Sequence, residues 1–250
     1  MTRASTRRHA GQDYRTTYTD LLEALRQPDC AVCRLVNQAV RQHVDVFLYE
    51  QLLVVARRDE IRAARGFCSI HGAMLVGGHG RMLGAATLHQ DIINDVARQI
   101  DRAMNAPLSA LKRAFPIGLR AVLRNVMRAV RPRRMCPLCE YERRQEGVVL
   151  RALVNDINDP ALRGAFERSA GLCLPHFQMA LDLQDAPAGN QARLVELERA
   201  ILASLKAELD EYLTKRNASY ETERMGEEAD APLRAVRLVS GRVVHSDGRM

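Results

Sequence analysis

Two short stretches decide the fold: Cys136-Pro137-Leu138-Cys139 and, after 33 intervening residues, Cys173-Leu174-Pro175-His176. The same pattern occurs earlier as Cys30-Ala31-Val32-Cys33 and, after 34 residues, Cys68-Ser69-Ile70-His71. The two copies are offset by 106 residues at the first pair and by 105 at the second. All 6 cysteines of the 250-residue chain fall inside this pattern. Spacing kept to one residue over such a distance predicts an internal duplication.

Each copy holds the donors of a metal site. A Cys-x-x-Cys turn brings two thiolates to one ion, and a Cys-x-x-His turn adds a thiolate and an imidazole, which completes a tetrahedral Cys3His zinc site. Both kinds of turn are predicted at helix starts, where the helix dipole favours the thiolate. We predict two Zn²⁺ per chain, each closing a helical hairpin within one copy. The predicted ligands are Cys30, Cys33, Cys68 and His71 in the first copy, and Cys136, Cys139, Cys173 and His176 in the second.

Other uses of these residues stay open. Three cysteines and a histidine also hold iron–sulfur clusters, so a cluster is the alternative cofactor. Paired cysteines in a reducing compartment also serve as reversible dithiols, although no βαβ pattern of the thioredoxin type accompanies them. Buried cysteines without a ligand are disfavoured, because a histidine follows three residues after both Cys68 and Cys173.

Most of the chain shows helical periodicity, as in the apolar row Leu194, Leu197, Ile201 and Leu205. We predict an all-α protein of two tandem duplicated helical modules, each closed by a CxxC…CxxH metal site. The tail residues 236–244 fit either a small β-hairpin or a disordered chain. The predicted segments are module 1 at 16–106, a basic inter-module helix at 107–135, module 2 at 136–217, and a linker and tail at 218–250.

Composition narrows the class of protein. The chain is 47% hydrophobic and 27% charged, as in ordinary globular proteins. Its 4% aromatic content argues against a large β-sandwich or a platform for single-stranded nucleic acid. The polar, basic start lacks a secretory signal and no long apolar stretch follows, so we expect a cytoplasmic location and no membrane contact. Neither a phosphate-binding loop nor a nucleophile elbow points to a small-molecule substrate.

The positive charge is concentrated in one segment. Residues 102–139 contain 9 lysines and arginines and no acidic residue, so the remaining chain carries 7 − 9 = −2 of the formal charge of +7. The spacing places Arg120, Arg124 and Arg128 on one helix face, followed by Arg131, Arg133 and Arg134. The other face is expected to be covered by apolar residues: Leu119, Leu123, Val126, Met127 and Val130. Such a stripe predicts an acidic protein surface or a nucleic acid as partner. The alternatives are a solvated face, or ion pairs with Glu196, Glu198, Glu208 and Glu211.

The doubled pattern CPxC…G(F/L)CxxH resembles an uncharacterised bacterial family that is known only as a domain of unknown function. The resemblance covers about residues 20–215 and rests on the eight ligands together with Gly66 and Gly171. The first pair departs from it, because Ala31 stands where the second pair has Pro137. The resemblance implies the architecture and brings no reaction with it.

The sequence favours a protein that is not an enzyme. A site with four protein ligands leaves no open position for water or substrate at the metal. We expect a zinc-binding helical protein whose metals stabilise the fold and whose arginine-rich region binds a macromolecule. The main alternative is an iron–sulfur or thiol redox protein, acting as a sensor or in electron transfer, and a weaker one is a nucleic-acid-binding regulator.

Overall fold

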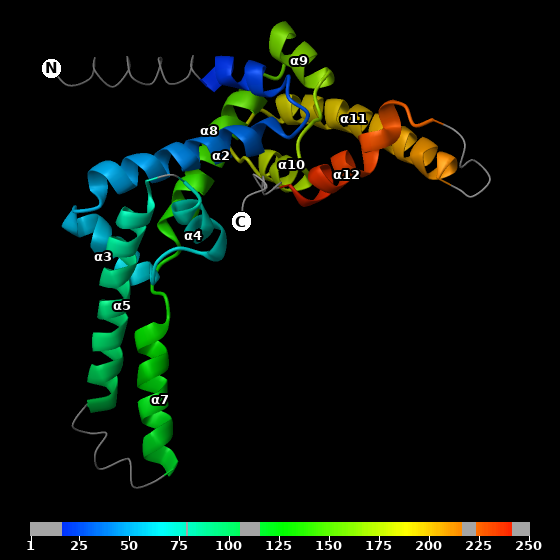
Figure 1. Ribbon diagram of the computed structural model, residues 1–250. Helices are drawn as coiled ribbons and strands as arrows, with labels where there is room; N and C mark the ends of the chain where they lie inside the picture. Colours follow the sequence, from blue (N-terminus) through cyan, green and yellow to red (C-terminus); the bar gives the residue numbers. More distant parts are fainter. Residues whose placement is uncertain (1–16, 79, 106–115, 217–223, 242–250) are drawn as a thin grey trace, which may run out of the picture. The chain divides into compact units, whose positions relative to one another are not determined.

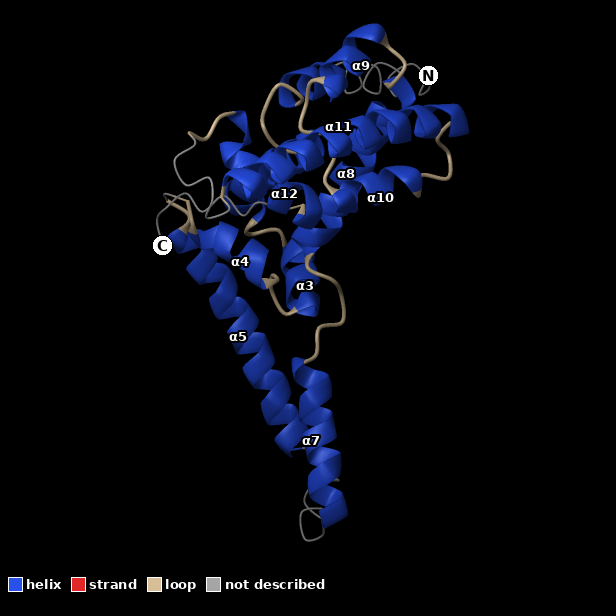
Figure 2. Ribbon diagram, turned by 90° about the vertical axis from the view of Figure 1, so that its right-hand side faces the viewer, coloured by secondary structure: helices blue, strands red, loops and turns tan. Residues whose placement is uncertain are grey.

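The computed structural model describes residues 17–78, 80–105, 116–216 and 224–241, and all regular elements in these ranges are helices (Figures 1 and 2). The all-α prediction is confirmed. The contacts divide the chain into a central unit, residues 39–143, and a flanking unit made of the described residues up to 38 and from 144 onward. The divisions fall inside α2 (Ala31–Val46) and α8 (Pro137–Asp156), so both helices contribute residues to both units.

The central unit is built around a long helical pair. After α2 come a π-helical turn η1 (Phe47–Gln51), α3 (Val55–Ala64), α4 (Ser69–Val76), α5 (Met82–Asn105) and α7 (Pro116–Val130). Helices α5 and α7 lie side by side and run in opposite directions (Figure 1). The base of α5 packs on η1 and α3 through a cluster of buried apolar residues: Phe47, Ile61, Leu88 and Ile92. Phe67, the residue before Cys68, packs against this cluster.

Arg65 stabilises the exit from α3. It adopts a left-handed conformation with φ 58° and ends the helix. Its side chain, only 8% exposed, pairs with Asp95 of α5 at 2.9 Å and donates to Gln99 at 2.7 Å and to the Ala129 carbonyl of α7. One arginine therefore joins the end of α3 to both helices of the long pair, next to Gly66 and the ligand turn.

The flanking unit is assembled on α8 and α11 (Ala188–Lys215), with α9 (Pro160–Glu167) and α10 (Leu174–Leu181) between them in sequence. Asp159 caps α9 by accepting the Ala161 and Leu162 N–H groups, both at 3.0 Å. The Tyr18 hydroxyl also donates to Asp159 at 2.6 Å, which attaches the N-terminal helical residues 17–24 to this cap. The core contains fully buried large side chains from four segments: Leu21, Leu153, Phe166 and Leu194.

The C-terminal segment is helical, so the hairpin prediction for the tail is wrong. A 3-10 turn η3 (Glu227–Asp230) leads into α12 (Ala231–Ser240), which packs on α11 through Ala231, Leu238 and Leu205. Apolar residues at helical spacing meet a complementary surface on α11, and this packing outweighs the β propensity of the valines. Residues 218–223 and 242–250 of the predicted linker and tail lie outside the described ranges.

Candidate metal centres

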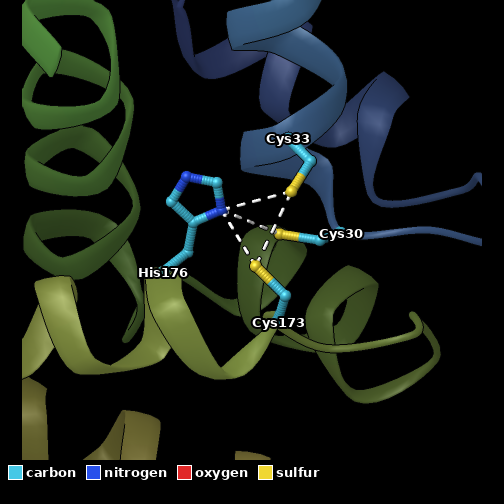
Figure 3. A group of neighbouring side chains, drawn as sticks. All are labelled: Cys30, Cys33, Cys173 and His176. Carbon is cyan, nitrogen blue, oxygen red and sulfur yellow. Dashed lines mark hydrogen bonds between the residues drawn. The ribbon is translucent and has the colours of Figure 1, made fainter. Parts of the chain in front are cut away.

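The eight predicted ligands come together as two groups of four. Within each group the donor atoms all lie within 4.8 Å of one another. The Cys30 site consists of Cys30, Cys33, Cys173 and His176 (Figure 3). The Cys68 site consists of Cys68, His71, Cys136 and Cys139. Each site thus combines one Cys-x-x-Cys turn with one Cys-x-x-His turn, as the sequence predicts.

The pairing of the turns differs from the prediction, which was wrong on this point. The Cys-x-x-Cys turn of each copy meets the Cys-x-x-His turn of the other copy. The reason is the length of α2: Cys30 precedes its first residue, whereas Val44 in its last turn packs in the cluster that includes Cys68. A helix of 16 residues is about 24 Å long, so its first turn cannot share an ion with Cys68.

The Cys30 site has the dimensions of a single tetrahedral ion. The His176 Nδ1 atom lies 3.5 Å from the Cys30 Sγ, 3.3 Å from the Cys33 Sγ and 3.1 Å from the Cys173 Sγ (Figure 3). The sulfurs of Cys33 and Cys173 are 3.6 Å apart. Zinc bond lengths imply edges of about 3.6 Å between sulfur and nitrogen and about 3.8 Å between sulfurs. The four side chains therefore fit one zinc ion with small adjustments.

The Cys68 site repeats this geometry. The His71 Nδ1 atom lies 3.2 Å from the Cys68 Sγ, 3.6 Å from the Cys136 Sγ and 3.3 Å from the Cys139 Sγ. The sulfurs of Cys68 and Cys139 are 3.7 Å apart. All six cysteines are free thiols, so no disulfide competes with metal binding at either site.

All four ligand turns stand at helix N-termini. Cys68 and Cys173 are the residues immediately before α4 and α10, and their carbonyls accept N–H groups from Gly72 at 2.7 Å and Phe177 at 2.8 Å. The first cysteine of each Cys-x-x-Cys turn does the same for α2 and α8. Ligands three residues apart then share one face of the first helical turn. Each site receives two helix N-termini, whose partial positive charge stabilises thiolates.

The ligand side chains shift one another's pKa, and at both sites the pKa of the cysteine of the Cys-x-x-His turn is lowered. Hydrogen bonds from Cys30 and Cys33 hold the pKa of Cys173 far below its usual value. Burial lowers the pKa of His176, but its bonds with Cys173, Cys30 and Glu146 outweigh this and raise it to about 11. At the other site burial opposes ionisation of Cys68, yet the His71 N–H and the neighbouring thiols lower its pKa. Burial raises the pKa of Cys139 to about 12.

Two glutamates of α8 face the outer nitrogens of the histidines. The Nε2 atom of His176 lies 3.4 Å from Glu146 Oε1, and that of His71 lies 3.6 Å from Glu142 Oε2. In both histidines Nδ1 is the atom that faces the sulfurs. The sequence does not single these glutamates out, because two acidic residues four positions apart on a helix also fit a solvated face.

A buried carboxylate supports the Cys-x-x-His turn of the Cys30 site. Glu198 of α11 is fully buried and accepts the Leu172 N–H at 3.0 Å. Gly171 has φ 73°, and a Cβ there would lie 2.8 Å from a Glu198 oxygen. Burial raises the pKa of Glu198 to about 7. At the Cys68 site the equivalent glycine, Gly66, faces an apolar group, the Cδ1 of Ile92.

The predicted basic face is exposed, but most of the apolar residues that were predicted to cover the opposite face are not buried. The side chains of Arg120, Arg124, Arg128 and Arg131 are exposed on α7 and on the turn that follows it. The helix faces inward through Val122 and Ala129 instead, while Leu123 and Met127 remain 52% and 68% exposed. The prediction that apolar residues cover the other face is therefore wrong for Leu123, Met127 and Val130, whereas Val126 is half-buried and the side chain of Leu119 lies outside the described ones. The opposite face of α7 packs on α5.

The remaining predicted arginines and acidic residues have other neighbours. Arg133 donates to Gln99 at 3.0 Å, and Arg134 lies 3.7 Å from Glu140. The carboxylates of the alternative interpretation pair elsewhere, Glu196 with Arg193, Glu208 with Arg234, and Glu211 with Lys215. These contacts give no support to ion pairing between those glutamates and the basic helix.

Among the helices of the described ranges, none combines the length and the apolar character needed to cross a bilayer.

Fold and sites together define an all-α protein with two Cys3His clusters, each assembled from both copies of an internal duplication. The chain belongs to DUF6062, a family of unknown function that matches residues 18–246. This confirms the resemblance drawn from the cysteine pattern. The chain is also 25% identical over 194 residues to the "Uncharacterized 23.9 kDa protein in xynA 3'region" of Caldicellulosiruptor sp. (strain Rt8B.4), which covers 77% of this chain and 81% of that protein. No solved structure matches the chain.

Proposed function

We propose that this chain is a non-enzymatic protein that binds two Zn²⁺ ions in structural Cys3His sites and recruits a macromolecular partner through its arginine-rich helix. The observation that carries the proposal is the assembly of all eight Cys and His ligands into two tetrads. Four protein donors complete the coordination of zinc, so neither site offers a position for substrate.

The distances support a single ion over a cluster. Sulfur–sulfur separations of 3.6 Å and 3.7 Å suit thiolates on one metal. In an iron–sulfur cluster the cysteines bind different iron atoms, and their sulfurs stand further apart. Three thiolates and an imidazole also suit the borderline-soft Zn²⁺ ion.

A structural role follows from the sequence distances that each ion would bridge. The Cys30 site joins residues separated by more than 130 positions, and the Cys68 site joins residues separated by more than 60. A metal that fixes such distant segments contributes its binding free energy to folding. Thiolate sites of this kind suit a reducing compartment, which agrees with the expected cytoplasmic location.

Metal analysis of anaerobically purified protein, together with its absorption spectrum, tests the proposal. We expect a colourless protein with about two zinc ions per chain. A brown protein that contains iron and sulfide would overturn the zinc assignment and establish the redox alternative. A protein purified without bound metal that does not take up zinc would remove the function altogether.

The basic helix supports the second half of the proposal. Four exposed arginines on and after α7 carry the charge, and the exposed Leu123 and Met127 lie beside them. Apolar contacts favour an acidic protein surface over a phosphate backbone, which needs only the cations. The nucleic-acid alternative requires salt-sensitive binding to duplex DNA or RNA.

A triple variant tests the two partner classes. Arg120→Ala/Arg124→Ala/Arg128→Ala is compared with the control Arg193→Ala/Lys206→Ala on α11. If wild type binds duplex DNA or RNA and only the triple variant loses that binding, the partner is a nucleic acid. If neither nucleic acid binds at low salt, the acidic protein surface remains the proposed partner.

A further inference from the structure

We infer that Glu142 and Glu146 of α8 are positioning residues for the two metal centres: each accepts the Nε2–H of one ligand histidine and thereby commits the Nδ1 atom to the metal. The inference rests on the proposed metal binding and goes beyond it, because it assigns an outer partner to each site. It also gives α8 a role at both sites that its counterpart α2 does not have.

The arrangement is clearest at the Cys30 site. The imidazole of His176 points its Nδ1 atom at three sulfurs, at 3.1 to 3.5 Å (Figure 3). Its other nitrogen lies 3.4 Å from Glu146 Oε1, at the long end of hydrogen-bonding distance. Both side chains are largely shielded, with 8% and 16% exposed. A neutral histidine that ligates through Nδ1 carries its proton on Nε2, where this carboxylate accepts it.

The Cys68 site has a corresponding pair of a histidine and a glutamate, which lie slightly further apart. The Nε2 atom of His71 lies 3.6 Å from Glu142 Oε2, and the histidine side chain is fully buried. The carboxylate of Glu142, which is 14% exposed, faces this nitrogen, and a hydrogen bond between a buried N–H group and a carboxylate stabilises the fold. A shift of a few tenths of an ångström makes this contact a hydrogen bond.

Helix geometry explains how α8 serves both histidines. Positions 142 and 146 are four apart, so their side chains leave the same face of the helix one turn apart. The equivalent positions of α2, offset by 106 residues, are Val36 and Val40, which are buried at 3% and 1% exposure. The duplication alone therefore does not produce these contacts. The acidic pair distinguishes α8 from its duplicated counterpart.

The carboxylates have two effects on the metal centres. They hold each imidazole in one tautomer and one ring orientation, and they raise its strength as a ligand. Removal of such a partner weakens metal binding by about 10- to 100-fold in comparable sites. The effect is expected to be larger for Glu146, whose contact is shorter.

Zinc competition with a chromophoric chelator, on the full chain, measures the effect at each site. The variants are Glu146→Ala, Glu146→Gln, Glu142→Ala and Glu142→Gln. The control is Glu140→Ala, on the same helix, whose carboxylate lies 3.7 Å from Arg134. We expect each alanine variant to lower the zinc affinity of one of the two sites by about 10- to 100-fold and each glutamine variant to lower it less. The control should leave the zinc affinity of both sites unchanged.

A second readout separates positioning from packing. In ¹H–¹⁵N spectra of the zinc-loaded wild type, the ligand histidines should show a protonated Nε2 and a metal-bound Nδ1. Glu146→Gln keeps the shape of the side chain and an acceptor oxygen, so it should retain this tautomer and fold, even if Glu146→Ala does not fold. A change in thermal stability alone, at unchanged zinc affinity, would show that the glutamates only pack.

Two results would overturn the inference while leaving the proposed function intact. One is wild-type zinc affinity at both sites in the folded Glu146→Ala and Glu142→Ala variants. The other is coordination through Nε2 in the wild type. Failure of the proposed function is recognised separately, because the wild type itself would then bind no zinc.

Discussion

The exchanged pairing of the ligand turns makes a prediction that differs from the one made by pairing within each copy. In the double variant Cys30→Ala/Cys33→Ala, the structure releases Cys173 and His176 from their site, because these are the other two ligands. Pairing within each copy would instead release Cys68 and His71. Both arrangements predict the loss of one metal ion, so the identity of the released cysteine decides between them.

The magnitude follows from the number of donors that remain. A complete structural zinc site in small zinc domains is worth roughly 10–16 kcal/mol of apparent binding free energy at neutral pH. If the loss of two thiolates removes even half of this, about 5 kcal/mol, affinity falls by more than about a thousandfold. Cys173 and His176 alone would then not retain the ion at micromolar protein, while the Cys68 site keeps its full tetrad.

Differential alkylation with peptide mass mapping reads out the result. In mild urea, Cys173 should be modified in the double variant, while Cys68, Cys136 and Cys139 stay protected until a strong chelator is added. The matched variant Cys136→Ala/Cys139→Ala should expose Cys68 and leave Cys30, Cys33 and Cys173 protected. Modification of Cys68 in the first variant and of Cys173 in the second would refute the exchanged pairing.

Two further predictions concern the turn that carries Cys173. Burial raises the pKa of Glu198 from 4.5 to about 7, so its contribution to stability is complete below pH 4.5 and is lost as the pH rises through 7. Glu198→Gln keeps the acceptor for Leu172 and cannot ionise. Urea unfolding should therefore show an advantage of the variant that grows between pH 4.5 and about 7 to at most about 3 kcal/mol and stays constant above that; an advantage independent of pH would contradict this. Gly171→Ala should lower the free energy of unfolding by about 1–3 kcal/mol, because a Cβ at this position is strained at the left-handed φ of 73° and lies too close to Glu198. Gly66→Ala brings the same kind of backbone strain at φ 95°, but its Cβ meets only Ile92 at 3.6 Å, so it should lack the part of the loss that comes from Glu198; equal losses would argue against the role of Glu198.

Local chemistry was readable along the chain. The all-α class, the eight ligands and the placement of every ligand turn at a helix start follow from residue spacing and helix-start signals, which act over a few positions. The basic face of α7 was readable for the same reason. The sequence does not show which apolar residues of α7 are buried, because the packing of α7 on α5 decides that Val122 and Ala129 are buried.

The C-terminal segment shows the same difference between what local sequence predicts and what tertiary packing decides. The valines around 236–239 predict strand as readily as helix, and only the surface of α11 selects helix α12. Glu142, Glu146 and Glu198 likewise look like surface charges in the sequence, whereas the fold places each beside a ligand turn.

By itself, the sequence determined what kind of sites this protein builds: two sets of three cysteines and a histidine, each donor pair held on one helical turn. Which Cys-x-x-Cys turn meets which Cys-x-x-His turn was decided only by the tertiary structure. Spacing along the chain records that two donors share a turn, since a turn spans three residues. It does not record where a helix of 16 residues ends in space. The length of this helix separates the two turns of one copy, so that each turn meets a turn of the other copy instead.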